Sequence, residues 1–432
     1  MATESELRNH CHINTNDNGD TFVGVKSDGT ALSVCFPIGY CLPDDNRVLR
    51  HDVLNLITVL AKFSGLKEKN LPQNQIFSHD TVDFPIQAYL SIMNHFLNSG
   101  YYSESEIHYK PGSRGKKSWP RTIKQIKPSY QENSERDGYG SFVYLDYIVK
   151  ENASNDTNLI TLVHEYCVYE SYEKVGWLFN MAPPQKPRLR FDKKMFLGTV
   201  YEKLGKTFSD ATRELFSSMI AMINYLGDNG SINQFYFGTD RFEYVWENLI
   251  DFTYGVDDKD RYFPHTVWNL KTGRNRQNAA LEPDTIMVVG NKIFVLDAKY
   301  YRYGTTAQPL HLPESTSINK QITYGEYVAS QEAFKREFGP DMKVYNAFIM
   351  PFGKNSKVFT QPDSYRHIGE ATGLWKSGEH EYEHVQGILV DISSLMHNYI
   401  RQNQPEILKL ADLIEQACNS GNPTTATTVA AV

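Results

Sequence analysis

The chain has few cysteines, five in 432 residues, and they lie far apart in the sequence. No two of them form a CxxC pair, so the sequence indicates neither a disulfide framework nor a zinc ribbon. No apolar run reaches the roughly 18 to 20 residues that a membrane helix requires. The first ten residues also lack the basic and apolar regions of a signal peptide. We therefore expect a cytoplasmic protein that makes no contact with a membrane.

The chain also lacks an excess of positive charge. With 44 basic and 51 acidic residues its net charge is −7, which excludes a histone-like polycation. It contains no phosphate-binding GxxxxGK(S/T) motif, so we do not expect it to carry its own P-loop NTPase. By contrast, 41% hydrophobic and 13% aromatic residues are sufficient for cores in two or three domains.

Hydrophobic patterns predict strands first and then a mixture of helices and strands. Residues 22–40 alternate apolar and polar side chains around a Ser-Asp-Gly turn, which predicts a β-hairpin. Apolar residues at helical spacing predict helices, and the apolar segment at 343–352 predicts a buried strand. The predicted helical segments are 52–63, 85–100, 191–226, 240–252 and 317–334.

The prolines between Met181 and Lys194 interrupt this periodicity and indicate a domain boundary. We expect an N-terminal α+β domain over residues 1–185, which would contact a partner or DNA. A C-terminal α/β domain over residues 186–415 would hold a mixed sheet flanked by helices. Residues 416–432 carry little that could be packed, and we expect them to form a disordered tail.

A strongly basic segment lies inside the N-terminal half. From Lys110 to Lys127 there are seven basic residues and no acidic one, a local charge of +7 in a chain of net charge −7. This asymmetry favours contact with a polyanion, and the alternative is a solvated loop. The residues that we predict to bind phosphates are Arg114, Lys116, Lys117 and Arg121.

The segment that carries most chemical information is EPDTIMVVGNKIFVLDAKYYRY, residues 282–303. Its two β-branched runs flank Gly290-Asn291, a dipeptide suited to a two-residue hairpin loop. In such a hairpin Val289 opposes Lys292, and the same register places Asp284 opposite Asp297. Strand alternation puts Lys299 on the same face as Asp297.

Two carboxylates opposite each other, about 5 Å apart, repel and require a compensating cation. A hard divalent ion such as Mg²⁺, or Mn²⁺ in its place, would bridge Asp284 and Asp297. It would polarise a phosphate and lower the pKa of a bound water, while Lys299 positions that water or stabilises the developing charge. The alternative is a simple surface ion pair near a strand end.

Pro283-Asp284, twelve intervening residues and Asp297-Ala298-Lys299 resemble the PD-(D/E)xK nuclease signature. The resemblance implies that both acids bind metal and that the lysine assists attack on a phosphodiester. It also implies a further Glu from the helix before the hairpin. Glu243 and Glu247, four residues apart on one helical face, are the candidates, with Glu247 slightly preferred. The alternative for each is a solvated helix acid.

The helix after the hairpin adds a second resemblance. Lys320, Gln321 and Tyr324 look like the Gln/Tyr motif of a nuclease branch that includes McrC. By this resemblance Gln321 belongs to the catalytic or metal-binding set, and Lys320 binds phosphate. Tyr324 follows Gln321 by three residues rather than the usual four, so core packing is the alternative for its role.

Further segments extend the likeness from about Phe22 to about Leu413: FVGVK, FPIGY, GKKSWPRTIK, DAKYY and TSINKQITY. Together they resemble the LlaJI family of restriction endonuclease subunits, relatives of McrC. The resemblance implies a Mg²⁺-dependent nuclease subunit for phage defence, which cleaves double-stranded DNA together with a McrB-like AAA+ GTPase. It also implies an α/β PD-(D/E)xK core preceded by an α+β domain.

Two other functions are open. One is a stand-alone type II restriction endonuclease that both reads and cuts its site. The other is a docking module that stimulates a partner GTPase and retains a vestigial nuclease fold. The intact set of Asp284, Asp297 and Lys299 speaks against the second.

Overall fold

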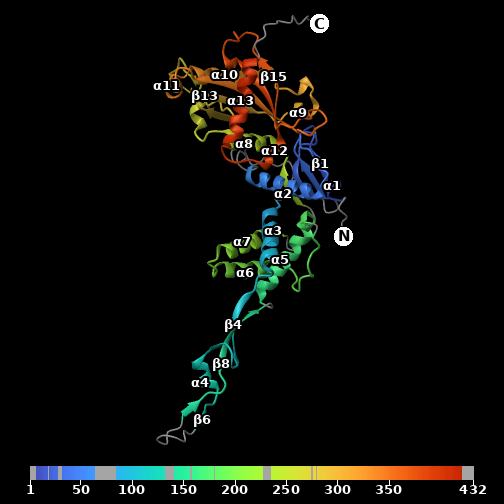
Figure 1. Cartoon of the computed structure of the whole chain (residues 1–432), viewed down its shortest axis with the longest axis vertical. Coiled ribbons are helices and arrows are strands. Elements are labelled where there is room, and N and C mark those ends of the chain that lie inside the picture. Colours follow the sequence, from blue (N-terminus) through green and yellow to red (C-terminus); the bar gives the residue numbers. More distant parts are fainter. Residues whose placement is uncertain are drawn as a thin grey trace. The chain divides into compact units, whose positions relative to one another are not determined.

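The computed structural model describes residues 6–17, 19–27, 32–63, 84–131, 141–155, 158–179, 181–226, 235–273, 276–278 and 280–420 (Figure 1). The chain divides into two compact units. Unit 1 is formed by Phe84–Ile232, and unit 2 by Ala2–Asp83 together with Asn233–Val432. This division differs from the expected boundary near residue 185.

The difference arises from a pairing between distant strands in unit 2. Strand β2 (Val23–Ser27) pairs antiparallel with β9 (Phe235–Thr239), and on its other side with β3 (Leu32–Phe36). The chain therefore leaves this sheet to form unit 1 and later returns to it. Local periodicity carries no information on such a pairing. The sequence analysis therefore placed the domain boundary at the proline-rich segment, which is visible in the sequence.

The predicted N-terminal hairpin is confirmed as β2 and β3. Strand β1 (Cys11–Ile13) pairs parallel with β3 and completes the sheet order β1-β3-β2-β9, so this part of the N-terminus is ordered. Helix α1 (Glu6–Asn9) precedes it. Helix α2 (Asn46–Phe63) follows the sheet and buries one apolar stripe, which includes Leu49, Val53, Leu56 and Leu60.

The main sheet of unit 2 has the strand order β12-β13-β14-β16-β15. The hairpin of β12 and β13 is antiparallel, β13, β14 and β16 run parallel, and β15 is antiparallel to β16. The strands are β12 (Thr285–Val289), β13 (Lys292–Ala298), β14 (Lys343–Phe352), β15 (Tyr365–Thr372) and β16 (His384–Asp391). The chain is thus a mixed α/β protein, as expected.

Helices of unit 2 surround this sheet (Figure 1). Helix α10 covers one face, where Tyr324 and Val328 pack on Ile286 and Val295 in a buried apolar cluster. Helix α8 contacts the β12–β13 hairpin. The helices and 3₁₀ segments are α8 (Phe242–Tyr254), η4 (Lys259–Tyr262), α9 (Tyr303–Thr306), η5 (Pro309–His311), α10 (Ser315–Ser330), α11 (Glu332–Phe338), η6 (Glu381–Glu383), α12 (Ile392–His397) and α13 (Gln404–Ser420). The two-residue strands β10 (Val267–Trp268) and β11 (Arg276–Gln277) pair with each other.

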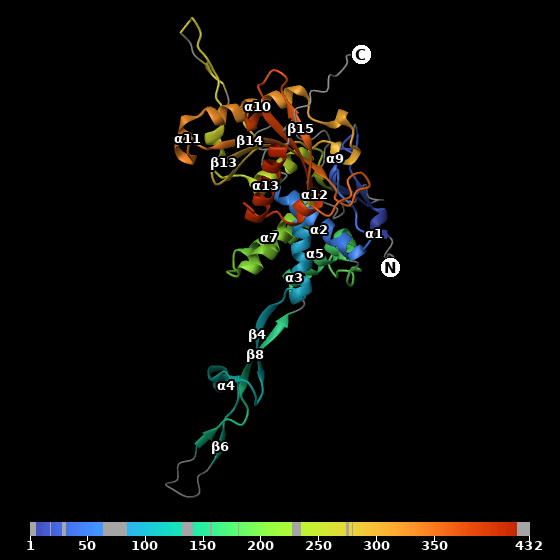
Figure 2. The same cartoon turned by 45° about the horizontal axis from the view of Figure 1, so that its top comes forward.

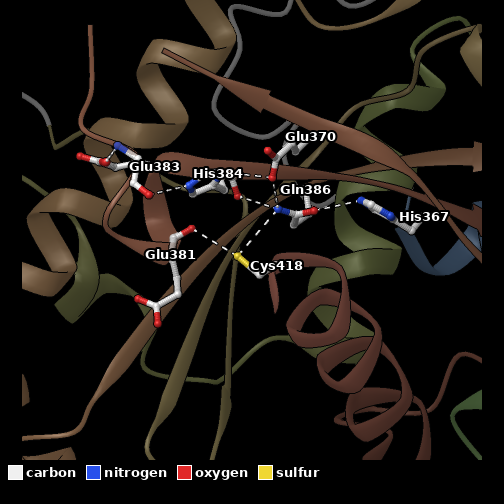
Figure 3. Close-up of polar contacts among 8 residues, drawn as sticks. His367, Glu370, Glu381, Glu383, His384, Gln386 and Cys418 are labelled. Carbon is white, nitrogen blue, oxygen red and sulfur yellow. Dashed lines mark hydrogen bonds and ion pairs between the residues drawn. The ribbon is translucent and has the colours of Figure 1, made fainter. Parts of the chain in front are cut away.

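Helix α13 extends to Ser420, so the expectation of a tail from residue 416 is wrong for residues 416–420. Ala417 is buried, and Cys418 joins a polar network with β15 and β16 (Figure 3). In that network Gln386 lies 2.9 Å from the His367 ring and donates to Glu370 and to the Cys418 sulfur. These contacts fix the last turn of α13. Residues 421–432 lie outside the described part of the chain.

Unit 1 combines helices with a three-stranded sheet drawn out as a long ribbon (Figure 2). Strand β4 (Glu104–Pro111) pairs with β8 (Ile148–Asn155), and β5 (Lys116–Lys117) pairs with β8 on the same ribbon. The segment between β4 and β8 also carries α4 (Trp119–Gln125), β6 (Ser129–Gln131) and β7 (Ser141–Val143). The other helical elements are α3 (Ile86–Ser99), α5 (Leu159–Val175), η3 (Gly176–Phe179), α6 (Lys193–Leu204) and α7 (Asp210–Tyr225). None of the helices in the described residues is long and apolar enough to span a membrane.

Candidate active site

The β12–β13 hairpin brings the two predicted aspartates together. Val289 opposes Lys292 and Thr285 opposes Leu296, so the predicted register is confirmed. One further step along the ladder places Asp284 beside Asp297. The Asp284 carboxylate accepts a hydrogen bond from the backbone N–H of Ala298 at 2.9 Å, which fixes it against the end of β13.

Lys299 is the cation nearest to Asp297. Its Nζ lies 2.7 Å from the Asp297 carboxylate, and the Asp297 side chain is only 5% exposed. Its backbone N–H donates to the carbonyl of Ile349 on β14, which holds the segment after β13 in line with the sheet. Burial alone would lower the pKa of Lys299, but Asp297 and, to a smaller extent, Asp284 outweigh it and raise that pKa. Lys299 is therefore a stable ammonium group beside both acids.

Helix α10 supplies a second cation and a phenol to the same place. Burial alone would lower the pKa of Lys320, but its hydrogen bond to Tyr324 and the charges of Asp297 and Asp284 outweigh burial and raise that pKa. Burial raises the pKa of Tyr324, the hydrogen bond from Lys320 opposes this, and the charges of the two aspartates add to it. Tyr324 is itself fully buried in the apolar cluster under α10, which agrees with core packing. Its hydroxyl lies 3.4 Å from the carbonyl of Glu282.

Gln321 lies in the core between α10 and β13. It is 1% exposed and donates at 2.7 Å to the carbonyl of Val295, two residues before Asp297. Its Oε1 atom is buried and has no hydrogen-bond partner among the described residues. Gln321 therefore links α10 to β13 directly below the acids.

Helix α8 presents the two candidate glutamates near the end of β13. Trp246, between them, donates its indole N–H at 3.2 Å to the carbonyl of Ile349, which also accepts from the Lys299 backbone. Burial raises the pKa of Glu243, and the charge of Glu247 adds to this effect. Burial raises the pKa of Tyr300, and the charge of Glu243 adds to this effect. Glu243 therefore lies close to the segment that follows the hairpin.

Two residues that the sequence analysis did not name join this site. Asp251 occupies the next turn of α8 after Glu247, and Lys259 donates to its carboxylate at 2.8 Å. The same Lys259 Nζ donates at 2.7 Å to the backbone carbonyl of Asp284. The spacing of four residues in Glu243, Glu247 and Asp251 was a signal for Asp251. Lys259 had no such signal, because it lies on a separate 3₁₀ segment.

A cleft of about 480 Å³ opens beside Asp284. Its lining combines cationic, acidic and aromatic side chains: Lys259, Asp260, Phe263, His265, Glu282, Pro283 and Asp284.

A sequence model of the LlaJI restriction endonuclease family matches residues 22–366, more than half of the chain. The chain belongs to the LlaJI restriction endonuclease family.

The match confirms the resemblance that the motifs indicated. Residues 22–366 of this LlaJI-family chain include the hairpin acids, α8, α10 and the basic segment, although the match ends before the expected limit near Leu413. A search of curated proteins found no match. The family's description places the chain among restriction endonucleases, enzymes that cleave DNA.

The donor set of the LlaJI-family hairpin fits a hard divalent ion. Asp284 and Asp297 offer carboxylate oxygens, which Mg²⁺ prefers. Asp297 is almost fully buried, and a buried carboxylate is stable only with compensating positive charge. The buried Gln321 Oε1 also has no partner among the described residues.

The basic segment of the LlaJI-family chain lies in unit 1, whereas the acids lie in unit 2. Its predicted phosphate ligands, Arg114, Lys116, Lys117 and Arg121, are all exposed. Two of them stack on aromatic rings, Lys117 at 3.5 Å from the Tyr147 ring centre and Arg121 at 3.9 Å from that of Tyr109. Stacking holds these cations at the surface of the ribbon and leaves their charges available.

Proposed function

We propose that this protein is a Mg²⁺-dependent DNA endonuclease subunit of a restriction system, and that Asp284, Asp297 and Lys299 form its hydrolytic centre. The observation that carries this proposal is the pair of aspartates held by one hairpin, one by the Ala298 N–H and the other by Lys299. The family match supports DNA as the substrate.

In this proposal Asp284 and Asp297 hold the metal, with Glu247 as the predicted third carboxylate. When bound, Mg²⁺ would polarise the scissile phosphate and acidify a water. Lys299, fixed by Asp297, orients the attacking water or neutralises the charge that develops on the phosphate. Lys320, on α10, contacts a phosphate oxygen.

We further propose that a McrB-like GTPase delivers the protein to DNA, with the ribbon as docking surface. Acidic net charge disfavours strong autonomous binding to phosphates. The ribbon exposes apolar side chains beside its cations, with Trp119 49%, Ile123 60% and Phe142 72% exposed. Apolar groups gathered on an exposed segment favour a protein partner over plain solvent.

Plasmid cleavage in Mg²⁺, with and without the GTPase of the same system and GTP, separates the candidate functions. We expect negligible specific cleavage by the isolated chain and efficient cleavage with the partner. Site-specific cleavage by the chain alone would favour the stand-alone enzyme. Stimulation of GTP hydrolysis without any DNA cleavage would favour the docking module.

The contribution of the basic segment is tested by salt. If Arg114, Lys116, Lys117 and Arg121 contact phosphates, replacing all of them by Gln should reduce the slope of log K against log salt by about one unit per lost contact. Binding of the complex to a labelled duplex over a range of salt concentrations measures the slope. An unchanged slope would leave the segment with the partner interface.

The choice between the two glutamates of α8 is tested by a matched pair of variants. We expect Glu247→Gln to lower the cleavage rate about 100-fold, since a neutral amide is a poorer ligand for Mg²⁺. Glu243→Gln, one turn away on the same helix, should retain most of the rate. The reverse order would assign the third carboxylate to Glu243, and full activity of both would remove α8 from the metal site.

A further inference from the structure

A second group of metal-ligating side chains lies at another place in unit 2. His51 and Asp52 are on α2, and His397 ends α12. One ligand atom from each residue lies within 4.8 Å of the other two. The His397 Nε2 atom is 3.0 Å from the Asp52 carboxylate, and the two imidazole rings stack at 5.5 Å with an angle of 14°.

The hydrogen bond on the far side of His397 prepares this ring for a metal. Its Nδ1 lies 2.7 Å from the backbone carbonyl of Ser393. A carbonyl can only accept, so Nδ1 carries a proton. The Asp52 carboxylate also accepts, so in the metal-free protein Nε2 donates a proton to it across 3.0 Å, and zinc would take the place of that proton. Histidines that bind metals typically donate their other N–H to a carbonyl or carboxylate in this way.

The surroundings of Asp52 favour a cation. Its side chain is 5% exposed. A second carboxylate, Asp391, lies close enough for its charge to raise, like that of Asp52, the pKa of both His397 and the buried Tyr40. Both histidines remain exposed, so an ion from solution can reach the group.

We propose that His51, Asp52 and His397 bind one Zn²⁺ ion. Two imidazoles and one carboxylate form a common protein ligand set for zinc, and a water completes the tetrahedron. With zinc bonds of about 2.0 to 2.2 Å, tetrahedral ligand atoms lie about 3.3 to 3.6 Å apart. Binding therefore requires Asp52 and His397, now 3.0 Å apart, to separate slightly, and any wider separation in the group to close. Mg²⁺ prefers oxygen ligands, so the two sites of unit 2 select different ions.

Bound zinc would join two segments that are far apart in the sequence. Helix α2 belongs to the N-terminal part of unit 2, and α12 directly follows β16 of the main sheet. A hydrogen bond from Asn55 to the carbonyl of Met396 also connects these helices. Zinc binding at this place therefore clamps α2 to the main sheet, whether or not the proposed nuclease activity is correct.

The test uses the full chain, freed of metal by a chelator and kept in excess Mg²⁺. Titration should show one Zn²⁺ per chain, and Co²⁺ in its place should give visible absorption typical of tetrahedral coordination. The melting temperature should rise with zinc concentration. His51→Ala and His397→Ala should each lower zinc affinity by at least about 100-fold, since even the loss of an outer hydrogen bond costs 10- to 100-fold.

Three control variants separate a metal site from a simple ion pair. His397→Cys removes the pair with Asp52 but keeps a zinc ligand, so it should retain stoichiometric zinc. His380→Ala, at an exposed histidine of the same unit, and Asp284→Asn, in the nuclease site, should both bind zinc as the wild type does. Absence of zinc from the wild type, or equal affinity in the wild type and both alanine variants, would overturn the proposal. Because His51 is exposed, its alanine variant decides the question even if His397 variants fail to fold.

Discussion

Asp284→Asn is expected to lower the rate of DNA cleavage by about 1,000-fold, since the loss of one metal ligand removes several kcal/mol of transition-state stabilisation. The same change should leave the metal-free protein at least as stable as the wild type. An asparagine oxygen can still accept from the Ala298 N–H, and the repulsion from Asp297 disappears. Relief of that like-charge pair contributes about 0.2 to 1 kcal/mol. Cleavage rates and melting curves without Mg²⁺ measure the two effects.

Asp297→Asn provides the informative contrast to this variant. It should lose cleavage equally, but it should melt at a lower temperature because Lys299 loses its ion-pair partner in a largely buried place. Asp341→Asn, at an exposed aspartate before β14, serves as the matched control and should behave as the wild type. Wild-type cleavage by Asp297→Asn would end the assignment of this hairpin to the chemistry.

Removal of residues 112–147, the segment between β4 and β8, is expected to abolish the cleavage that depends on the partner. Pro111 and Ile148 are paired residues of β4 and β8, so a Gly-Asn turn can replace residues 112–147 and close the hairpin there. The change removes the basic segment except Lys110, together with the exposed apolar side chains, while unit 2 keeps all its strands. Assisted cleavage should fall to the level of the isolated chain, measured with plasmid DNA, partner and GTP.

A deletion of residues 1–185 would be less informative, because it would also remove β1, β2 and β3 from unit 2. The shortened chain should retain zinc binding and the melting behaviour of unit 2, which serve as controls for folding. The variant with Gln at Arg114, Lys116, Lys117 and Arg121 keeps the apolar groups and separates charge from packing. Full assisted cleavage by the shortened chain would show that the ribbon is not the docking surface.

The accuracy of the sequence-based predictions depended on how local each feature is. The hairpin acids were predictable because a two-residue loop fixes the register of both strands. Helices α8 and α10 were predictable for the same reason, because the apolar spacing that defines each helix lies within its own segment. The position of Lys320 on α10 followed from that prediction. Gln321 shows the limit of this approach, since a motif does not reveal that its side chain lies below the acids in the core.

Features that depend on distant pairing were not predictable. The β2–β9 pairing decides that the N-terminal strands belong to unit 2, and nothing in either segment encodes it. The same holds for the contact of Lys259 with Asp284 and for that of His397 with Asp52. The end of α13 was also wrongly predicted, because contacts with β15 and β16 stabilise its last turn.

The central claim is that Asp284 and Asp297 hold a divalent ion, and its most direct test is Mn²⁺ binding in place of Mg²⁺, which needs neither the recognition sequence nor the partner. Calorimetry or the electron paramagnetic resonance of free Mn²⁺ reports the number of ions bound, with zinc added first to occupy the histidine group. We expect the wild type and Asp341→Asn to bind Mn²⁺ at this site, and Asp284→Asn and Asp297→Asn each to lose that ion. Equal Mn²⁺ binding by the wild type and both hairpin variants would contradict the assignment.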